Sequence, residues 1–104
     1  MITIDKLLFY VNDKIEFYNQ YNYLPAAMKG MLMAFEHCKS YIEFLNALDN
    51  DKPLPTSDYD KIYALKSDIL FKLQYYIIQD DINDLDLGII IAFREFLSFI
   101  IKHS

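Results

Sequence analysis

The residues from Gly88 to Ile101 are apolar on almost every side, with only Arg94, Glu95 and Ser98 interrupting them. The run is shorter than the roughly 20 residues that a membrane-crossing helix needs, and it contains two charges. A helix with so narrow a polar stripe must be covered over most of its circumference. In a chain of 104 residues, that cover comes from other helices of the chain or from a partner.

The spacing of the remaining apolar residues predicts an all-α fold, a mainly antiparallel four-helix bundle in a single domain. Only two glycines and three prolines punctuate the chain, which disfavours a turn-rich β fold. The second and fourth helices are expected to be the most buried. The helices are predicted at about 4–21, 25–48, 58–79 and 84–102, with residues 49–57 as the linker.

Local signals mark where the helices begin. Thr3 is suited to cap the first helix, and Pro25 to stand in the first turn of the second. Ser57 followed by Asp60 resembles a weak capping box at the start of the third. Phe71 and Ile78 are expected to stay exposed on the third helix. Its predicted core face consists of Tyr59, Ile62, Tyr63, Leu65, Ile69, Leu70, Leu73, Tyr76 and Ile77.

The charge of the chain is negative and unevenly placed. The net charge is −5, and residues 49–86 hold nine of the 15 acids against four of the 10 bases. No basic patch is present, so direct binding to nucleic acid or to an anionic membrane surface is not expected. A single cysteine and an N-terminus without the features of a signal peptide favour a cytoplasmic location.

The second helix has more apolar surface than a bundle core requires. One arc holds Phe35, Cys38 and Ile42 and is assigned to the core. A second arc lies nearly opposite and would leave several hundred Å² of apolar surface uncovered on a monomer. The sequence therefore predicts a protein-binding surface and a homodimer. The predicted binding residues are Met33, His37, Tyr41, Phe44 and Leu48.

Two acidic clusters invite other interpretations. Asp80, Asp81, Asp84 and Asp86 fit no register of a calcium-binding loop, so they are assigned to the positive end of a helix. The second cluster surrounds the linker and consists of Asp49, Asp51, Asp58 and Asp60. It could resemble the phosphates of nucleic acid, although a solvated linker is the simpler explanation.

Residues with catalytic potential are not spaced as a site. His37 and Cys38 are adjacent and point about 100° apart on a helix, and no acid is spaced along the sequence to meet His37. Arg94 and His103 are nine residues apart and face opposite sides of one helix. No catalytic residue, cofactor or metal ligand is assigned. A helical enzyme with an interhelical pocket remains an alternative, because catalytic residues can be distant in sequence.

The sequence thus predicts a small non-enzymatic protein that binds another protein. Inhibitors and immunity proteins encoded by phages or mobile elements are of this type, and the Ile, Lys, Asn, Asp and Tyr bias is typical of AT-rich genomes. The alternatives are a structural homodimer or adaptor, an acidic mimic of nucleic acid, and a helical-bundle enzyme. No motif identifies the partner.

Overall fold

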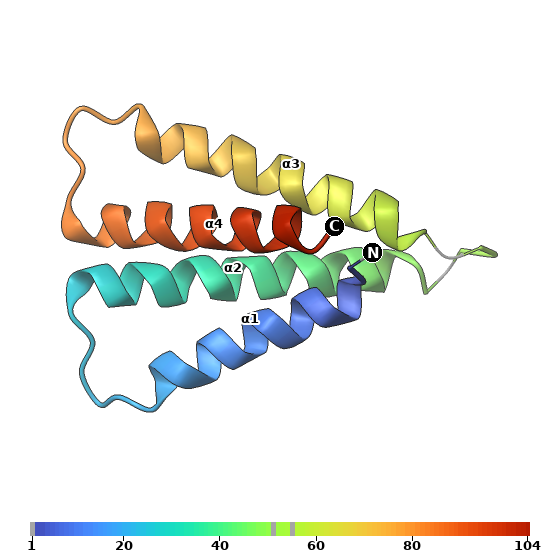
Figure 1. The fold of residues 1–104 in the computed structure, drawn as a ribbon, viewed down its shortest axis with the longest axis horizontal. Coiled ribbons are helices and arrows are strands. Elements are labelled where there is room, and N and C mark those ends of the chain that lie inside the picture. Colours follow the sequence, from blue (N-terminus) through green and yellow to red (C-terminus); the bar gives the residue numbers. More distant parts are fainter. Residues whose placement is uncertain (1, 51, 55) are drawn as a thin grey trace.

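The computed structural model describes residues 2–50, 52–54 and 56–104, and in this part of the chain all regular structure is helical. Successive helices run in opposite directions, as Figure 1 shows. The structure confirms the predicted all-α four-helix bundle. The helices are α1 (Ile4–Asn19), α2 (Ala26–Leu48), α3 (Asp58–Ile77) and α4 (Asp84–Lys102).

Side-chain caps define three of the helix starts. The Thr3 hydroxyl accepts a hydrogen bond from the Lys6 N–H, and the Ser57 hydroxyl accepts one from the Asp60 N–H. The Asn83 side chain caps α4 in the same way. These bonds satisfy backbone donors that have no partner within the helix. Pro25 is the N-cap of α2, one position before the first turn in which it was expected.

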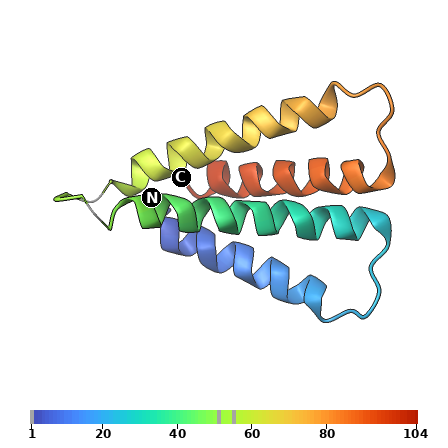
Figure 2. The same ribbon diagram turned by 180° about the vertical axis from the view of Figure 1, so that it is seen from behind.

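α2 and α4 form the centre of the bundle and run parallel to each other, with α1 and α3 on opposite sides of them (Figures 1 and 2). Both glycines of the chain lie at this contact. A Cβ atom added at Gly30 would lie 2.0 Å from the Leu85 carbonyl oxygen, and one added at Gly88 would lie 1.8 Å from the Ala27 carbonyl oxygen. Glycine is therefore required at both positions for the two backbones to approach so closely. α2 continues as one helix through Gly30.

The core lies between this central pair and the two outer helices. α1 contributes Leu7 and Val11, and α3 contributes Leu65 and Ile69, all of which are completely buried. α4 has the largest set of buried residues, as its apolar sequence predicts, whereas α2 has no more of them than α3. The buried residues of α4 are Gly88, Ile89, Ile90, Ala92, Phe93, Phe96, Leu97 and Ile100.

The predicted core face of α3 was too wide. The buried stripe is narrow, formed by Ile62, Leu65, Ile69 and Leu73. Phe71 and Ile78 are exposed as predicted. Because α3 lies at the outside of the central pair and contacts it along one side only, residues at the edges of the expected face remain in solvent. Four residues assigned to the core are exposed: Tyr59, Tyr63, Leu70 and Ile77.

Candidate functional site

The α2 arc, defined as Met33, His37, Tyr41, Phe44 and Leu48, lies on the outer surface of α2 and on its side toward α3. The side chains of Met33, Phe44 and Leu48 are 51%, 54% and 47% exposed. His37 and Tyr41 are half-buried. The arc is therefore an exposed apolar strip whose inner edge is covered within the chain.

His37 connects the arc to α3. Its Nε2 atom lies 2.7 Å from Asp68 Oδ2, and Lys72 Nζ lies 3.6 Å from the other oxygen of the same carboxylate. The His37 ring also packs edge-on against Phe93 of α4. No acid is spaced along the same helix to meet His37, and Asp68 reaches it from α3 instead. The contact fixes α3 beside α2 and orients the imidazole.

A hollow of about 190 Å³ lies beside this pair, where α2, α3 and α4 meet. Its polar side chains are His37, Lys72 and Tyr76. Its remaining lining is apolar and consists of Met33, Ala34, Ile89 and Phe93. An aspartate that orients a histidine is one component of a nucleophilic site, but no serine or cysteine lines this hollow.

Cys38 follows His37 in the sequence and has a potentially nucleophilic side chain, but it is completely buried. Burial raises the pKa of its thiol well above the ordinary value, and the negative charge of Asp68 raises the pKa further. The thiolate is the reactive form of cysteine, so this sulfur is unreactive in the folded protein. Cys38 acts as a small apolar core residue, as predicted.

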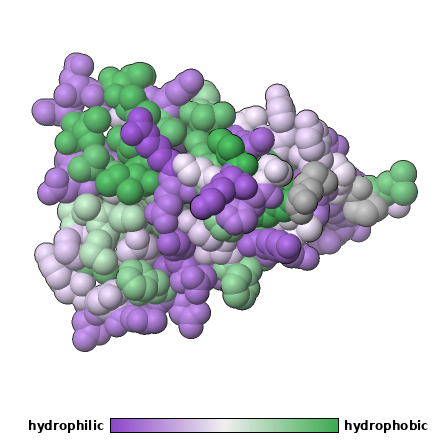
Figure 3. Space-filling view, in the orientation of Figure 1, coloured by the Kyte–Doolittle hydropathy of each residue, from purple (hydrophilic) through white to green (hydrophobic). Residues whose placement is uncertain are grey.

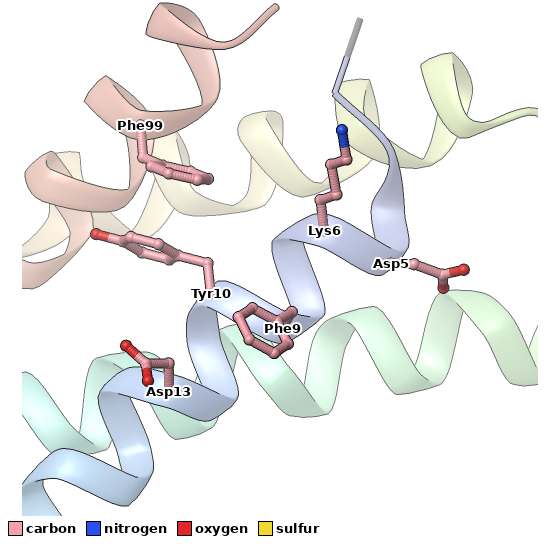
Figure 4. A pocket seen from close by; sticks show the side chains of 6 residues that line it. All are labelled: Asp5, Lys6, Phe9, Tyr10, Asp13 and Phe99. Carbon is pink, nitrogen blue, oxygen red and sulfur yellow. The ribbon is translucent and has the colours of Figure 1, made fainter.

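The α1 side of the molecule has a different arrangement, shown in Figure 4. Tyr10 stacks on Phe99 of α4, with ring centroids 4.0 Å apart. Its hydroxyl donates to Glu95, which also forms an ion pair with Lys14 at 2.9 Å. Burial raises the pKa of the Tyr10 hydroxyl above its ordinary value, and the Glu95 carboxylate raises it further. Tyr10 therefore remains protonated and holds α1 against α4.

An open hollow of about 580 Å³ adjoins this stack and is lined by both exposed and packed side chains of α1. Phe9, which is 75% exposed, stands beside it. The described residues that line the hollow include no pair of a nucleophile and a base. Its lining residues are Asp5, Lys6, Phe9, Tyr10, Asp13 and Phe99, labelled in Figure 4.

Of the linker acids, Asp49 contacts α3. Asp49 closes the end of α2, where its Oδ2 atom lies 2.6 Å from Lys61 Nζ. The Lys61 ammonium also donates to Asn46, and the Thr56 N–H donates to Asp49. The helical spacing of α3 places Lys61 away from the predicted core face, yet Lys61 is buried, because this carboxylate and amide take the place of water around its ammonium group. Asp51 lies outside the described residues, as does Pro55.

These contacts make stability at low pH depend on Asp49. Hydrogen bonds from Lys61 and then from Thr56 hold the pKa of its carboxyl well below the usual range. The fold thus stabilises the ionised form. Its contribution is fully present above about pH 4, the pKa of an unfolded aspartate, and is lost as the pH falls toward the lower folded pKa.

We therefore expect Asp49→Asn to lower the melting temperature at pH 7 and to lower it less as the pH falls below 4. Circular dichroism melts from pH 7 to pH 2 would measure this convergence. Asp13→Asn is the control, because Asp13 is exposed and forms no ion pair with another described residue. A difference between wild type and Asp49→Asn that is constant with pH would contradict the assignment.

Of the four acids between α3 and α4, two lie at the start of a helix, whereas Asp80 and Asp81 lie in the turn before it. Asp84 and Asp86 lie in the first turn of α4, where carboxylates interact favourably with the positive end of the helix. Across the described ranges, His, Cys, Asp and Glu side chains nowhere gather in a group of three that could hold a metal ion. Nor does any described helix combine the length and apolar character needed to cross a membrane.

Sequence reasoning missed one surface because it assigned that surface to the core. Leu70 and Ile77 of α3 lie exposed beside α4, whose Ile91 and Ile101 are also exposed. Strongly apolar side chains gather over α3 and α4 in Figure 3, toward the upper left of the view. These residues are uncovered because α3 contacts the central pair along one side only. The sequence pattern alone does not distinguish them from core residues.

The two candidate surfaces are therefore the α2 arc and the exposed side of α3 and α4. No protein-family model, curated protein or solved structure matches this chain.

Proposed function

We propose that this chain is a small non-enzymatic protein that works by binding another protein, in the manner of small inhibitors and immunity proteins. The observation that supports this proposal is the exposure of large apolar side chains on the α2 arc. Met33, Phe44 and Leu48 are each about half exposed although the core is complete beneath them. Apolar surface of this kind, gathered on one face, is typical of interaction sites.

The arc also has the composition of an interface. Aromatic residues and methionine are enriched where proteins bind each other, and charged residues are depleted at the centre of such surfaces. The Tyr41 and Phe44 rings lie 6.1 Å apart and present aromatic area together. His37 is held by Asp68, so this part of the arc is already ordered before a partner binds. An ordered surface loses less conformational entropy on binding.

We expect Phe44→Ser to leave the fold intact and to weaken capture of the partner. Because Phe44 is an exposed helical residue, the free energy of unfolding should change by no more than about 0.5 kcal/mol. If it is an interface hot spot, binding should lose about 2 kcal/mol, a roughly thirtyfold higher Kd. The measurements are urea unfolding and affinity capture from the source cells, followed by titration of the captured protein.

Phe9→Ser is the matched control, because Phe9 is an exposed phenylalanine on α1, away from the arc. Equal loss of capture by both variants would contradict a role for the arc. Failure of the wild-type chain to capture any protein, together with a monomer at about 0.1 mM in light scattering, would refute the proposed function.

A homodimer is the second candidate, and the same exposed arc favours it. A second copy could cover Phe44 and Leu48 as well as a foreign partner could. Light scattering distinguishes the two: a wild-type dimer that becomes monomeric in Phe44→Ser, with no other protein captured, would support the structural homodimer.

A further inference from the structure

A groove follows the line where α3 meets α4. Its larger part is a hollow of about 330 Å³, lined by Tyr63, Lys66, Ser67, Leu70, Leu97 and Ile101. A second hollow of about 250 Å³ shares Tyr63 and Lys66 with the first and adds Ile2, Tyr59, Ile62 and Ser104. The two hollows therefore adjoin at Tyr63 and Lys66, and together they are named the α3–α4 groove.

The walls of the groove are apolar. Leu70 is 49% exposed and Ile101 is 68% exposed, and Leu97 closes the floor between them. From Tyr59 to Leu70 the groove follows about 16 Å of α3, which is three turns of helix. This length matches a short helical segment.

The charges of the groove have the opposite sign to the chain as a whole. The chain carries −5, yet among the residues that the structure describes Lys66 is the one charged side chain that lines either hollow. Arg94 is exposed on α4 three residues before Leu97, so the two are neighbours on the helix surface. Lys66 thus lines the groove and Arg94 lies next to it on α4, and neither cation has an ion-pair partner among the described residues.

We propose that the α3–α4 groove receives an acidic amphipathic helix of a partner protein. The apolar residues of that helix, spaced three and four apart, fill the groove between Tyr63, Leu70 and Ile101, and its carboxylates face Lys66 and Arg94. A groove between two packed helices accepts a third helix by the same side-chain packing that forms bundles. This inference rests on the proposed protein-binding function and identifies the chemistry of the bound segment.

The test uses the full chain and two synthetic 18-residue peptides. Both peptides carry leucines at positions i, i+3, i+4 and i+7 of a helix, flanked by glutamates in one and by lysines in the other. Fluorescence anisotropy gives the affinities, and amide chemical shifts of the isotope-labelled protein locate the site. We expect the glutamate peptide to bind at least tenfold more tightly, with shifts along α3 and α4, and to weaken with added salt.

Charge reversal provides the decisive comparison. The double variant Lys66→Glu, Arg94→Glu should invert the preference, so that the lysine peptide binds more tightly. The matched control is Lys6→Glu, Lys29→Glu, which changes the net charge equally at exposed positions on α1 and α2. Leu70→Asp should abolish binding of the glutamate peptide. Circular dichroism verifies that every variant retains the helical content of the wild type.

Equal binding of the two peptides, or no binding of either, would overturn the proposal. So would an equal response to the two charge reversals. If the groove amides instead shift with protein concentration in the absence of peptide, a second copy occupies the groove and the proposal is wrong. If the groove fails these tests while Phe44→Ser still weakens capture, the proposed function stands without this groove. If both fail, both are refuted.

Discussion

Gly88→Ala should destabilise this protein by at least about 3 kcal/mol, the upper end of what overpacking usually costs. The new Cβ atom would lie 1.8 Å from the Ala27 carbonyl oxygen and 2.7 Å from its carbonyl carbon, which are backbone atoms without rotamers to adjust. The clash can be relieved only by moving α2 and α4 apart, which opens the centre of the core. Urea unfolding monitored by circular dichroism measures the loss.

The expected loss of stability in Gly88→Ala is opposite in sign to the effect of helix propensity. In an ordinary helix interior, alanine is favoured over glycine by about 1 kcal/mol. Ser40 is exposed in the middle of α2, so comparing Ser40→Gly with Ser40→Ala should give that ordinary preference. If Gly88→Ala stabilises the protein by as much as the Ser40 comparison favours alanine, α2 and α4 do not approach each other as closely as they do in this structure. Gly30→Ala should behave like Gly88→Ala.

Phe35→Ala should cost about 3–5 kcal/mol, the range for removing a buried phenylalanine. Phe35 is completely buried on the core arc of α2 and packs against the rings of Tyr10 and Tyr18 of α1. Truncation would leave a cavity between α1 and α2 that rigid neighbours cannot fill. Thermal melts should show the same loss, at roughly 4–8 °C per kcal/mol for a domain of this size.

Phe71→Ala is the matched control, since Phe71 is also a phenylalanine within a helix but is 72% exposed. Its removal should change the free energy of unfolding by no more than about 0.5 kcal/mol. Comparable losses in the two variants would mean either that Phe71 is covered by a partner chain in solution or that Phe35 is not core.

The four helices could be predicted from sequence because each has a clear local signal. The first helix is predicted from an apolar stripe with helical spacing: Ile4, Leu7, Leu8, Val11, Ile15 and Tyr18. In the structure Leu8 and Ile15 are half-buried and the other four are buried. Thr3 and Ser57 mark helix starts through bonds to residues three positions away, which a sequence displays directly. The predicted ends at 21 and 79 lie two residues past Asn19 and Ile77, since no comparable signal marks where α1 and α3 stop.

The contacts between helices could not be predicted, because they join residues that are distant in sequence. No sequence pattern indicates that Gly30 approaches Leu85 or that Asp68 meets His37. Lys61 has the sequence position of a solvated lysine, and only the fold brings Asp49 and Asn46 to it. The α3–α4 groove was missed for the same reason, since Leu70 follows the helical spacing of a core residue.

The parallel pairing of α2 with α4 has a consequence for the order in which the chain can fold. The contact that joins Gly30 to the start of α4 closes a loop that contains the whole of α3. Such a non-local contact forms more slowly than contacts between successive helices. During synthesis the side of α2 that faces α4 has no cover until α4 has emerged. A nascent chain that stops before α4 would expose this surface and be prone to aggregate.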